Sequence, residues 1–334
     1  MKSPARQNLV TPMDWLLEPE NPSVRFFALQ WLSGKKQSDP EVREAAKAIM
    51  TTGPVPKILS YQKPEGYWGN PEDFYVRSKY KGTVWSFLLL AQLGADGKDP
   101  RIVKARDAIL RLSQEPESGG FAYSGGKEGS GYPGGIIPCL TGNMLWSMLR
   151  FGYLDHPGVK KGLGFITMYM RFDDGAEKAP KGFPYERFEN CWGKHTCHMG
   201  CFKMLKALSA IPPARRNSRV KTLLEEGTEH FLKHRIFKRS SDPSRVAKAK
   251  WLRLSFPYLW QYDVLEVLNT LADLGCRDER MHEAIRLVFS KRPPDGRYLL
   301  EETYNGRFLT SFEKKGKPSK WLTLLAMRML NALS

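Results

Sequence analysis

The densest group of reactive side chains lies between Cys191 and Cys201, in the sequence CWGKHTCHMGC. His195 and His198 are three positions apart, so a helix would place both imidazoles on one face. Asp263 stands in a later apolar segment, so a fold could bring its carboxylate to them. Imidazole, thiolate and carboxylate groups are zinc ligands, and one hypothesis is therefore a metal site of Cys191, His195, His198 and Asp263.

A second hypothesis for the same residues is acid–base chemistry. Imidazole titrates near neutral pH, so His195 or His198 could transfer a proton while Asp263 orients the ring. The segment lacks the paired Cys-x-x-Cys or His-Glu-x-x-His spacing of a strong zinc signature. The plain alternative is that the cysteines pack as small hydrophobic residues and the histidines are hydrogen-bonded within a polar core.

Two loops carry further candidates. Tyr185 and Arg187 lie in the Gly- and Pro-containing sequence KGFPYERFEN, and Tyr304, Asn305 and Arg307 lie in the last long loop. Loops hold binding residues more often than scaffold helices do, so we expect both to close over a pocket, with Tyr185 joining the catalytic set. Ordinary turn chemistry explains the Asn-Gly pair equally well. The remaining histidines are expected on the surface of outer helices: His156, His230, His234 and His282.

The elements that must position these residues repeat along the chain. Five apolar segments begin near Lys81, Cys139, Lys194, Tyr258 and Lys320, which are 58, 55, 64 and 62 residues apart. Amphipathic segments alternate with them, because their apolar residues recur every three or four positions. The sequence predicts these outer helices at Asp99–Gln114, His156–Met170, Asn217–His234 and Asp278–Lys291, and a first pair at Pro12–Leu32 and Asp39–Met50.

This period predicts a repeat architecture of inner and outer helices. An open solenoid needs polar end caps, but the last helix, expected at Trp321–Leu333, is as apolar as the middle ones. A closed ring explains this better, because the first and last units can cover each other. We therefore predict an all-α chain, one α/α toroid domain over residues 1–334, with about six helix pairs and a central cavity.

The loops after the outer helices repeat as well. The copies are Gln62-Lys-Pro-Glu-Gly66-Tyr67-Trp68, Gln114-Glu-Pro-Glu-Ser-Gly119-Gly120-Phe121 and Lys291-Arg-Pro-Pro-Asp-Gly296-Arg-Tyr298. The Gln can hydrogen-bond the turn, the Gly permits a positive φ, and the aromatic ring can pack against the next inner helix.

These loops and helix pairs resemble the squalene cyclase and protein prenyltransferase repeat superfamily, in a bacterial branch, whose QW-type motif Gln62 to Trp68 matches best. The resemblance covers nearly the whole chain and implies an α/α toroid with a central cavity. Cyclases of this superfamily protonate with a DxDD motif, of which Asp173-Asp174-Gly175 is a partial echo. The prenyltransferases bind zinc through Asp, Cys and His and need a second subunit. Neither activity transfers, although Asp173 and Asp174 could also hold magnesium with a diphosphate; a turn is the plain alternative.

In such a ring we expect the N-terminal ends of the inner helices to converge on one mouth, where unpaired backbone N–H groups attract anions. Polar residues such as Thr83 and Thr141 stand at these ends. The predicted substrate-binding residues at this mouth and its loops are Trp68, Trp85, Asn143, Trp146, Trp192, Arg187, Trp260, Gln261, Tyr304, Asn305, Arg307, Lys320 and Trp321.

Charge and cysteine content bound the partners. The 52 Lys and Arg against 35 Asp and Glu give a net charge of +17, which favours a small or oligomeric anionic substrate and peripheral contact with membrane headgroups. No nucleic-acid motif accompanies the charge, and a solvated basic surface is the plain alternative. Five cysteines are an odd number, the N-terminus lacks an apolar signal core, and no apolar stretch is long enough for a membrane span. We therefore expect a cytoplasmic protein.

The preferred functional hypothesis is a terpenoid cyclase- or prenyltransferase-like enzyme, a transferase or lyase, with an aromatic and polar central pocket. It would act on an isoprenoid-like or other apolar ligand with an anionic head, with zinc or magnesium as the cofactors to consider. One alternative is a lyase or hydrolase of an anionic polysaccharide, for which Asp263 with Glu186 or Glu301 are the candidate carboxylates. The other is a non-catalytic binding protein for an anionic ligand.

Overall fold

The computed structural model describes residues 12–73, 75, 79–125, 129–175, 177–239 and 241–333. Helices and loops make up this part of the chain, and its β-type pairs are isolated bridges such as Gln114 with Phe121. The predicted all-α class is confirmed.

The inner helices are buried on nearly every side, and every residue of α5 is buried. This follows from their composition, because a helix that is apolar all round must be enclosed by others. The inner layer comprises α2 (Pro22–Trp31), α5 (Thr83–Gln92), α7 (Pro138–Arg150), α10 (His198–Ser209), α12 (Val264–Asp273) and α14 (Lys320–Leu333).

The outer helices bury one face each, as α6 does with Ile102, Ala105 and Ile109. Polar side chains cap their starts: the Asp99 carboxylate accepts the N–H of Arg101 at 2.8 Å, and the Asn217 side chain accepts that of Val220 at 2.9 Å. The outer layer comprises α1 (Met13–Leu16), α3 (Pro40–Thr51), α4 (Pro54–Leu59), α6 (Pro100–Ser113), α8 (Pro157–Tyr169), α11 (Ser218–Lys233) and α13 (His282–Ser290), with α9 (Glu189–Trp192) in the loop before α10. Short 3-10 turns are η1 (Pro71–Asp73), η2 (Pro133–Gly135), η3 (Pro213–Arg215), η4 (Ala249–Leu252) and η5 (Glu279–Met281).

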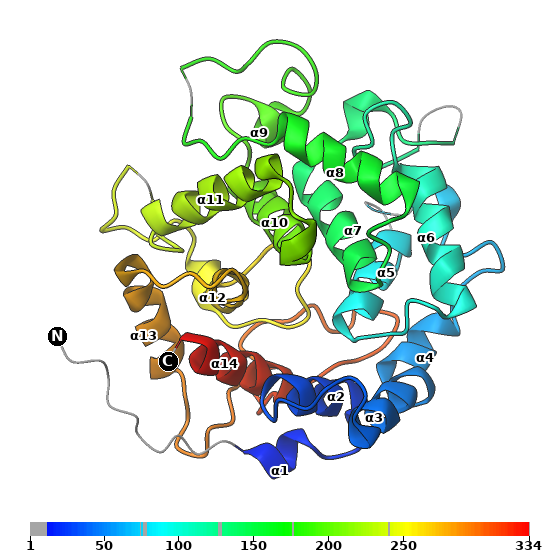
Figure 1. The fold of residues 1–334 in the computed structure, drawn as a ribbon, viewed down its shortest axis with the longest axis vertical. Coiled ribbons are helices and arrows are strands. Elements are labelled where there is room, and N and C mark those ends of the chain that lie inside the picture. Colours follow the sequence, from blue (N-terminus) through cyan, green and yellow to red (C-terminus); the bar gives the residue numbers. More distant parts are fainter. Residues whose placement is uncertain are drawn as a thin grey trace.

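The helices form a closed ring (Figure 1). Neighbouring inner helices pack in the order α5, α7, α10, α12, α14, α2, and the circle is closed from α2 back to α5 through contacts with α3 and α4. The contact between α7 and α10 is the most extensive because Gly142 lets the backbones meet: a Cβ there would lie 2.4 Å from the carbonyl carbon of Lys203. The predicted toroid with two helix layers is confirmed.

The repeated loops use the predicted hydrogen bonds. The Gln62 side chain donates to the carbonyl of Gly66 at 3.0 Å, and Gln114 donates to that of Gly119 at 3.0 Å. Gly66 has a φ of +95°, and a Cβ there would lie 2.4 Å from the carbonyl oxygen of Lys104, so only glycine fits against α6.

Each loop aromatic is also tied to the next inner helix through a threonine. The backbone N–H of Trp68 donates to the Thr83 hydroxyl at 3.0 Å, and that of Phe121 donates to the Thr141 hydroxyl at 3.0 Å. Tyr298 and Thr323 repeat the bond at 2.9 Å. The polar threonines at the N-terminal ends of the inner helices therefore anchor loops.

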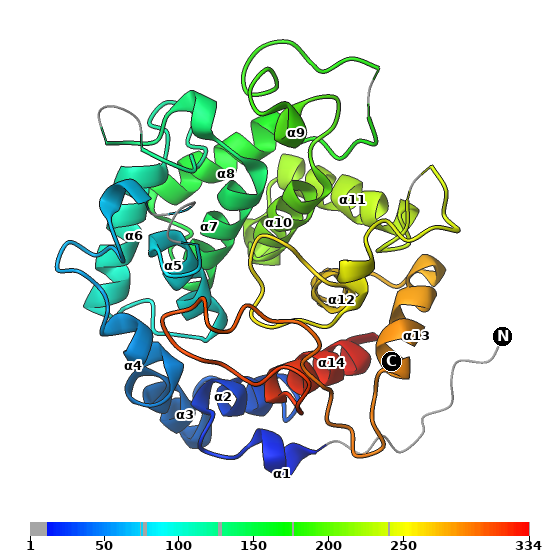
Figure 2. The ribbon, with the colours of Figure 1, turned by 180° about the vertical axis from the view of Figure 1, so that it is seen from behind.

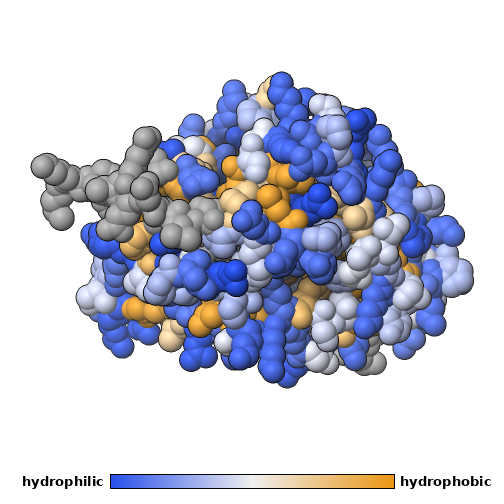
Figure 3. Space-filling model, turned by 90° about the horizontal axis from the view of Figure 1, so that it is seen from below, coloured by the Kyte–Doolittle hydropathy of each residue, from blue (hydrophilic) through white to orange (hydrophobic). Residues whose placement is uncertain are grey.

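The surface is mainly hydrophilic on the side shown in Figure 3, where hydrophobic residues form small separate patches. The exposed large hydrophobic residues are scattered in sequence: Tyr61, Met168, Phe188, Phe289 and Leu299. Within the described residues, every helix is too short or too polar to cross a lipid bilayer.

Candidate functional site

The ring surrounds a central cavity of about 150 Å³ that is open to solvent on one side. Its wall is built mostly from the C-terminal halves of the inner helices, together with the first turns of α14 and a loop before α12. The lining residues are Phe27, Trp31, Ala91, Gln92, Trp146, Arg150, Lys206, Ser209, Ala210, Phe256, Tyr258, Glu266, Asn269, Thr270, Asp273, Trp321, Leu325 and Arg328.

Each inner helix presents one face to the cavity. On α7 the lining residues Trp146 and Arg150 are four positions apart, and on α14 Trp321, Leu325 and Arg328 are four and three apart. Residues at these spacings share one side of a helix. Polar residues on the C-terminal halves of otherwise apolar helices could therefore have predicted the cavity lining from the sequence.

Aromatic rings cover much of the wall. Phe27 stacks on Trp31 with ring centroids 4.4 Å apart, and Phe256 stacks on Trp321 at 4.4 Å. The two pairs meet where the rings of Phe27 and Trp321 lie 6.0 Å apart. These surfaces suit an apolar ligand.

A buried ion triad connects α10 and α12. Glu266 accepts hydrogen bonds from Lys203 at 2.8 and 2.9 Å and from Lys206 at 2.7 Å. Burial lowers the pKa of Lys203 to about 8 despite the carboxylate. The Lys206 ammonium also lies 3.9 Å from the centre of the Trp146 ring, so it joins the triad to the aromatic wall.

Arg150 is the unusual cation in the cavity. Arg328 pairs with Asp273 and stacks over Trp31 at 4.2 Å, whereas Arg150 makes no hydrogen bond or ion pair with any residue in the described part of the chain. Arg150 is reached by water, yet desolvation by surrounding protein, and then the charge of Arg328, lowers its pKa. Four cations thus face two carboxylates around the cavity, counting Lys203 behind the wall.

The N-terminal ends of the inner helices do not form the mouth, contrary to the sequence prediction. Loop residues 253–262 and 301–319 cross that side of the ring (Figure 2). Gln92 clamps the first loop, since its side chain donates to the Tyr258 carbonyl at 2.7 Å and accepts the Tyr258 N–H at 2.9 Å. Behind them, the ring of Tyr80 contacts Trp85, Tyr304 and Phe308, with centroids 4.7 to 5.8 Å apart. Aromatic packing fills the end where a hollow was expected.

The predicted substrate-binding residues are consequently spread over the molecule. Trp146 and Trp321 line the cavity. Gln261 and Tyr304 line a separate small space of about 20 Å³ on the other side of the 253–262 loop. Trp260 contacts the Tyr80 hydroxyl at 3.4 Å.

The other members of that set have structural partners or lie in outer loops. The indole N–H groups of Trp68, Trp85 and Trp192 donate to backbone carbonyls at 2.8 to 3.0 Å, which holds the rings in the core. Further contacts are Asn143 with the Leu259 carbonyl, Asn305 with the 312–313 backbone, and Lys320 with Glu18. Arg187 and Arg307 are exposed.

The predicted catalytic residues are not brought together. Asp263 caps α12, where its carboxylate accepts from Ser255 at 2.7 Å and from the N–H of Glu266 at 2.9 Å. Burial raises its pKa to about 7. Tyr185 donates to the Tyr169 carbonyl at 3.0 Å, beside α8. Neither side chain lines the pocket that holds His195 and His198.

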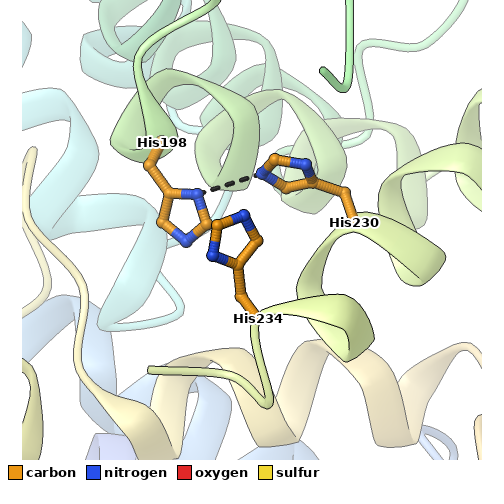
Figure 4. Close-up of side chains that lie close together, drawn as sticks. All are labelled: His198, His230 and His234. Atoms are coloured by element: carbon orange, nitrogen blue, oxygen red, sulfur yellow. Dashed lines mark hydrogen bonds between the residues drawn. The ribbon is translucent and has the colours of Figure 1, made fainter. Parts of the chain in front are cut away.

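His198 instead meets two histidines that the sequence analysis placed at the surface. His230 and His234 do stand on or directly after outer helix α11, but they are only 6% and 8% exposed, so that expectation was wrong. One ring nitrogen from each of His198, His230 and His234 lies within 4.8 Å of the others (Figure 4). Burial lowers the pKa of His230 to about 4 and that of His198 well below its usual value. His230 and His234 are four positions apart, which places them on one helix face, and this spacing could have predicted the cluster from the sequence.

The remaining metal candidates lie beside this cluster. His195 is exposed on the rim of the same pocket, and Cys191 is hydrogen-bonded to Cys197. Asp174 contacts His234 at 2.6 Å and Lys233 at 2.8 Å, and Asp173 pairs with Arg171 at 3.2 Å. Among the described residues, the cluster that could hold an ion therefore shares only His198 with the predicted set.

Comparisons with known proteins give distant structural likeness. No family model and no curated protein sequence matches the chain. The type II terpene cyclase MstE from Scytonema is 15% identical over 93% of this chain and 86% of its own, with a TM-score of 0.45. Cellobiose 2-epimerase from Bacillus thermoamylovorans is 10% identical over 86% of each chain, with a TM-score of 0.47. The GH76 α-mannanase BT2949 from Bacteroides thetaiotaomicron is 11% identical over 94% and 85%, with a TM-score of 0.46. Because these identities and TM-scores are low, the toroid assignment rests on the contacts between helices in this chain.

Proposed function

We propose that the chain is an enzyme whose active site is the central cavity, and that its substrate is isoprenoid-like or otherwise apolar with an anionic head. The observation that carries the proposal is Arg150, a guanidinium in the cavity wall without a counterion in the described part of the chain. Because this guanidinium is exposed to water and makes no ion pair with a described residue, an anionic group of a ligand can bind it without displacing a protein carboxylate. Guanidinium groups bind phosphate and carboxylate through two parallel hydrogen bonds.

The rest of the cavity suits the apolar part of such a ligand. The stacked pairs Phe27–Trp31 and Phe256–Trp321 offer ring faces, and such faces attract positive charge. A developing carbocation on an isoprenoid chain would be stabilised in this way, which supports a cyclase- or transferase-like reaction.

The polysaccharide alternative has less support in this cavity. Hydrolysis by a carboxylate pair needs one group that holds a proton and one that is free to act. Both carboxylates of the wall are engaged instead, Glu266 by two lysines and Asp273 by Arg328. A non-catalytic binding protein would use the same cavity, so only turnover separates it from an enzyme.

Equilibrium binding tests the ligand class. We expect farnesyl phosphate to bind with micromolar or better affinity, and farnesol or inorganic phosphate alone to bind at least about tenfold more weakly. Arg150→Gln should weaken farnesyl phosphate binding about 10- to 100-fold, because a charge-assisted hydrogen bond contributes about 1.5–3 kcal/mol. Arg111→Gln, on the exposed face of outer helix α6, is the matched control and should bind like the natural chain.

Turnover tests the enzymatic part. Farnesyl and geranylgeranyl diphosphates incubated with the protein, with and without magnesium, should yield a changed hydrocarbon product or released diphosphate in mass spectrometry. Arg150→Gln should lower that rate while Arg111→Gln leaves it unchanged. If both diphosphates bind tightly and are recovered intact, the chain is a binding protein. If Arg150→Gln binds farnesyl phosphate as tightly as the natural chain, the cavity is not the binding site.

A further inference from the structure

A second cluster stands at the opposite end of α10 from the central cavity. His198 is the first residue of α10, His230 lies in the last turn of α11, and His234 follows that helix directly. The Nδ1 atom of His198 lies 3.0 Å from Nε2 of His230. Figure 4 shows the three rings pointing toward one another between the two helices.

The hydrogen bonds of His234 fix how its ring faces the cluster. Its Nδ1 lies 3.0 Å from the Lys238 carbonyl oxygen, so this nitrogen carries the proton and donates it. A ligating histidine commonly donates in this way, which leaves Nε2 free to bind a metal. That Nε2 lies 2.6 Å from a carboxylate oxygen of Asp174. A metal ion bound by this nitrogen would therefore have the Asp174 carboxylate beside it.

Several buried polar atoms around the cluster lack partners. These atoms are Nε2 of His198, the Thr196 hydroxyl, Oδ1 of Asp173 and Nε of Arg171. Most buried polar atoms in folded proteins are hydrogen-bonded, so a group of exceptions at one place needs a cause. His198, Thr196 and Asp173 line an open pocket of about 250 Å³ that is also lined by His230 and His234, so a ligand there could reach these atoms.

We propose that His198, His230 and His234 bind one divalent transition metal ion of the zinc type, with a coordination position open toward this pocket. Three neutral imidazoles suit zinc and its first-row neighbours, and three protein ligands with an open fourth position are typical of catalytic zinc sites. Asp174 supplies negative charge beside the ion, and the pocket leaves space for water or an oxyanion on it.

This site is independent of the central cavity. The two pockets share no lining residue, and eight residues of α10 separate His198 from Lys206, which corresponds to about 12 Å along a helix. Failure of metal binding would therefore leave the cavity proposal intact, and failure of farnesyl phosphate binding would leave the metal site intact.

Calorimetric titration of the metal-stripped full-length protein with Zn²⁺ tests the proposal. We expect one ion per chain, and at least a 100-fold loss of affinity in His230→Ala and in His234→Ala. His230→Asn keeps a polar group of similar size and should show the same loss if the alanine variant folds poorly. His195→Ala is the matched control, because this histidine lines the same pocket outside the trio, and its affinity should be unchanged.

A Co²⁺ derivative tests the open position. Its visible absorption bands should shift when azide is added, because azide can bind only at a free coordination position. Zinc binding below 0.2 ions per chain, or equal affinity in His230→Ala, would overturn the metal site in this protein. Unshifted bands would show that no coordination position is open. A loss of zinc affinity in His195→Ala equal to that in His230→Ala would overturn the assignment of the three ligands.

Discussion

The two ends of the inner helices perform different tasks. At the N-terminal ends, Thr83, Thr141 and Thr323 accept the backbone N–H groups of loop aromatics, and rings packed around Tyr80 fill the opening. Toward the C-terminal ends, the side chains line a cavity in which Arg150 has no counterion. Polar residues near the start of these helices therefore maintain the fold, and those further along are available to a ligand.

The largest expected effect is at the packed end. Trp68→Ala should lower the free energy of unfolding by about 3–5 kcal/mol, because a fully buried indole and its hydrogen bond are lost. Trp31→Ala removes a half-buried ring of the cavity and should lower it by less than about 2 kcal/mol. Urea unfolding of both variants measures the difference, and equal losses would contradict the division between the two ends.

A pH series addresses Asp263 at the closed end. Its pKa in the folded chain is raised to about 7 from an ordinary value of 3.8, so the folded state holds a proton that the unfolded state releases. Stability attributable to this group is therefore fully present below about pH 4 and is lost as the pH rises through 7, on the order of 4 kcal/mol. Asp263→Asn should flatten this slope in urea unfolding between pH 4 and 7. An unchanged slope in the variant would assign the pH dependence to other groups.

A smaller loss is expected from a single loop anchor. Thr141→Val keeps the shape of the side chain but leaves the Phe121 N–H buried without an acceptor, which costs about 1–2 kcal/mol. Thr222→Val, on the exposed face of α11, is the control and should change stability by less than about 0.5 kcal/mol. Thermal unfolding of Thr141→Val and Thr222→Val checks this. Similar midpoints would show that the threonine hydrogen bonds do not contribute to stability.

The smallest effect on stability is expected at the cavity. Arg150→Gln should change the free energy of unfolding by less than about 0.5 kcal/mol, because the exposed guanidinium loses only a contact with the Phe27 ring, whose centre is 5.9 Å away. The same substitution should have the largest effect on ligand binding. A destabilisation above 2 kcal/mol in urea unfolding would instead assign Arg150 to the fold.

The sequence predicted the layers well because they depend on local patterns. Apolar and amphipathic helices alternate as expected, and the outer helices capped by Asp99 and Asn217 begin within one residue of the predicted positions. Two inner helices start later than their apolar segments. Helix α10 begins at His198 because Cys197 caps it. Helix α12 begins at Val264 because Asp263 caps it and residues 258–262 form a loop across the ring. The sequence shows several polar residues that could cap each of these helices. It does not show which of them forms the cap.

Which end of the ring is closed could not be predicted in the same way. It depends on the long loops 253–262 and 301–319, whose path is set by distant contacts such as that of Gln92 with Tyr258. The histidine cluster joins α10 to the end of α11, and only the spacing of His230 and His234 was visible beforehand. Neither feature has a local pattern that fixes it.

A crystal structure of the protein with farnesyl phosphate tests the central claim most directly. We predict the phosphate against the Arg150 guanidinium and the hydrocarbon chain along Trp31, Trp146 and Trp321. Density at the closed end beside Tyr80, or only on the outer surface, would contradict the account.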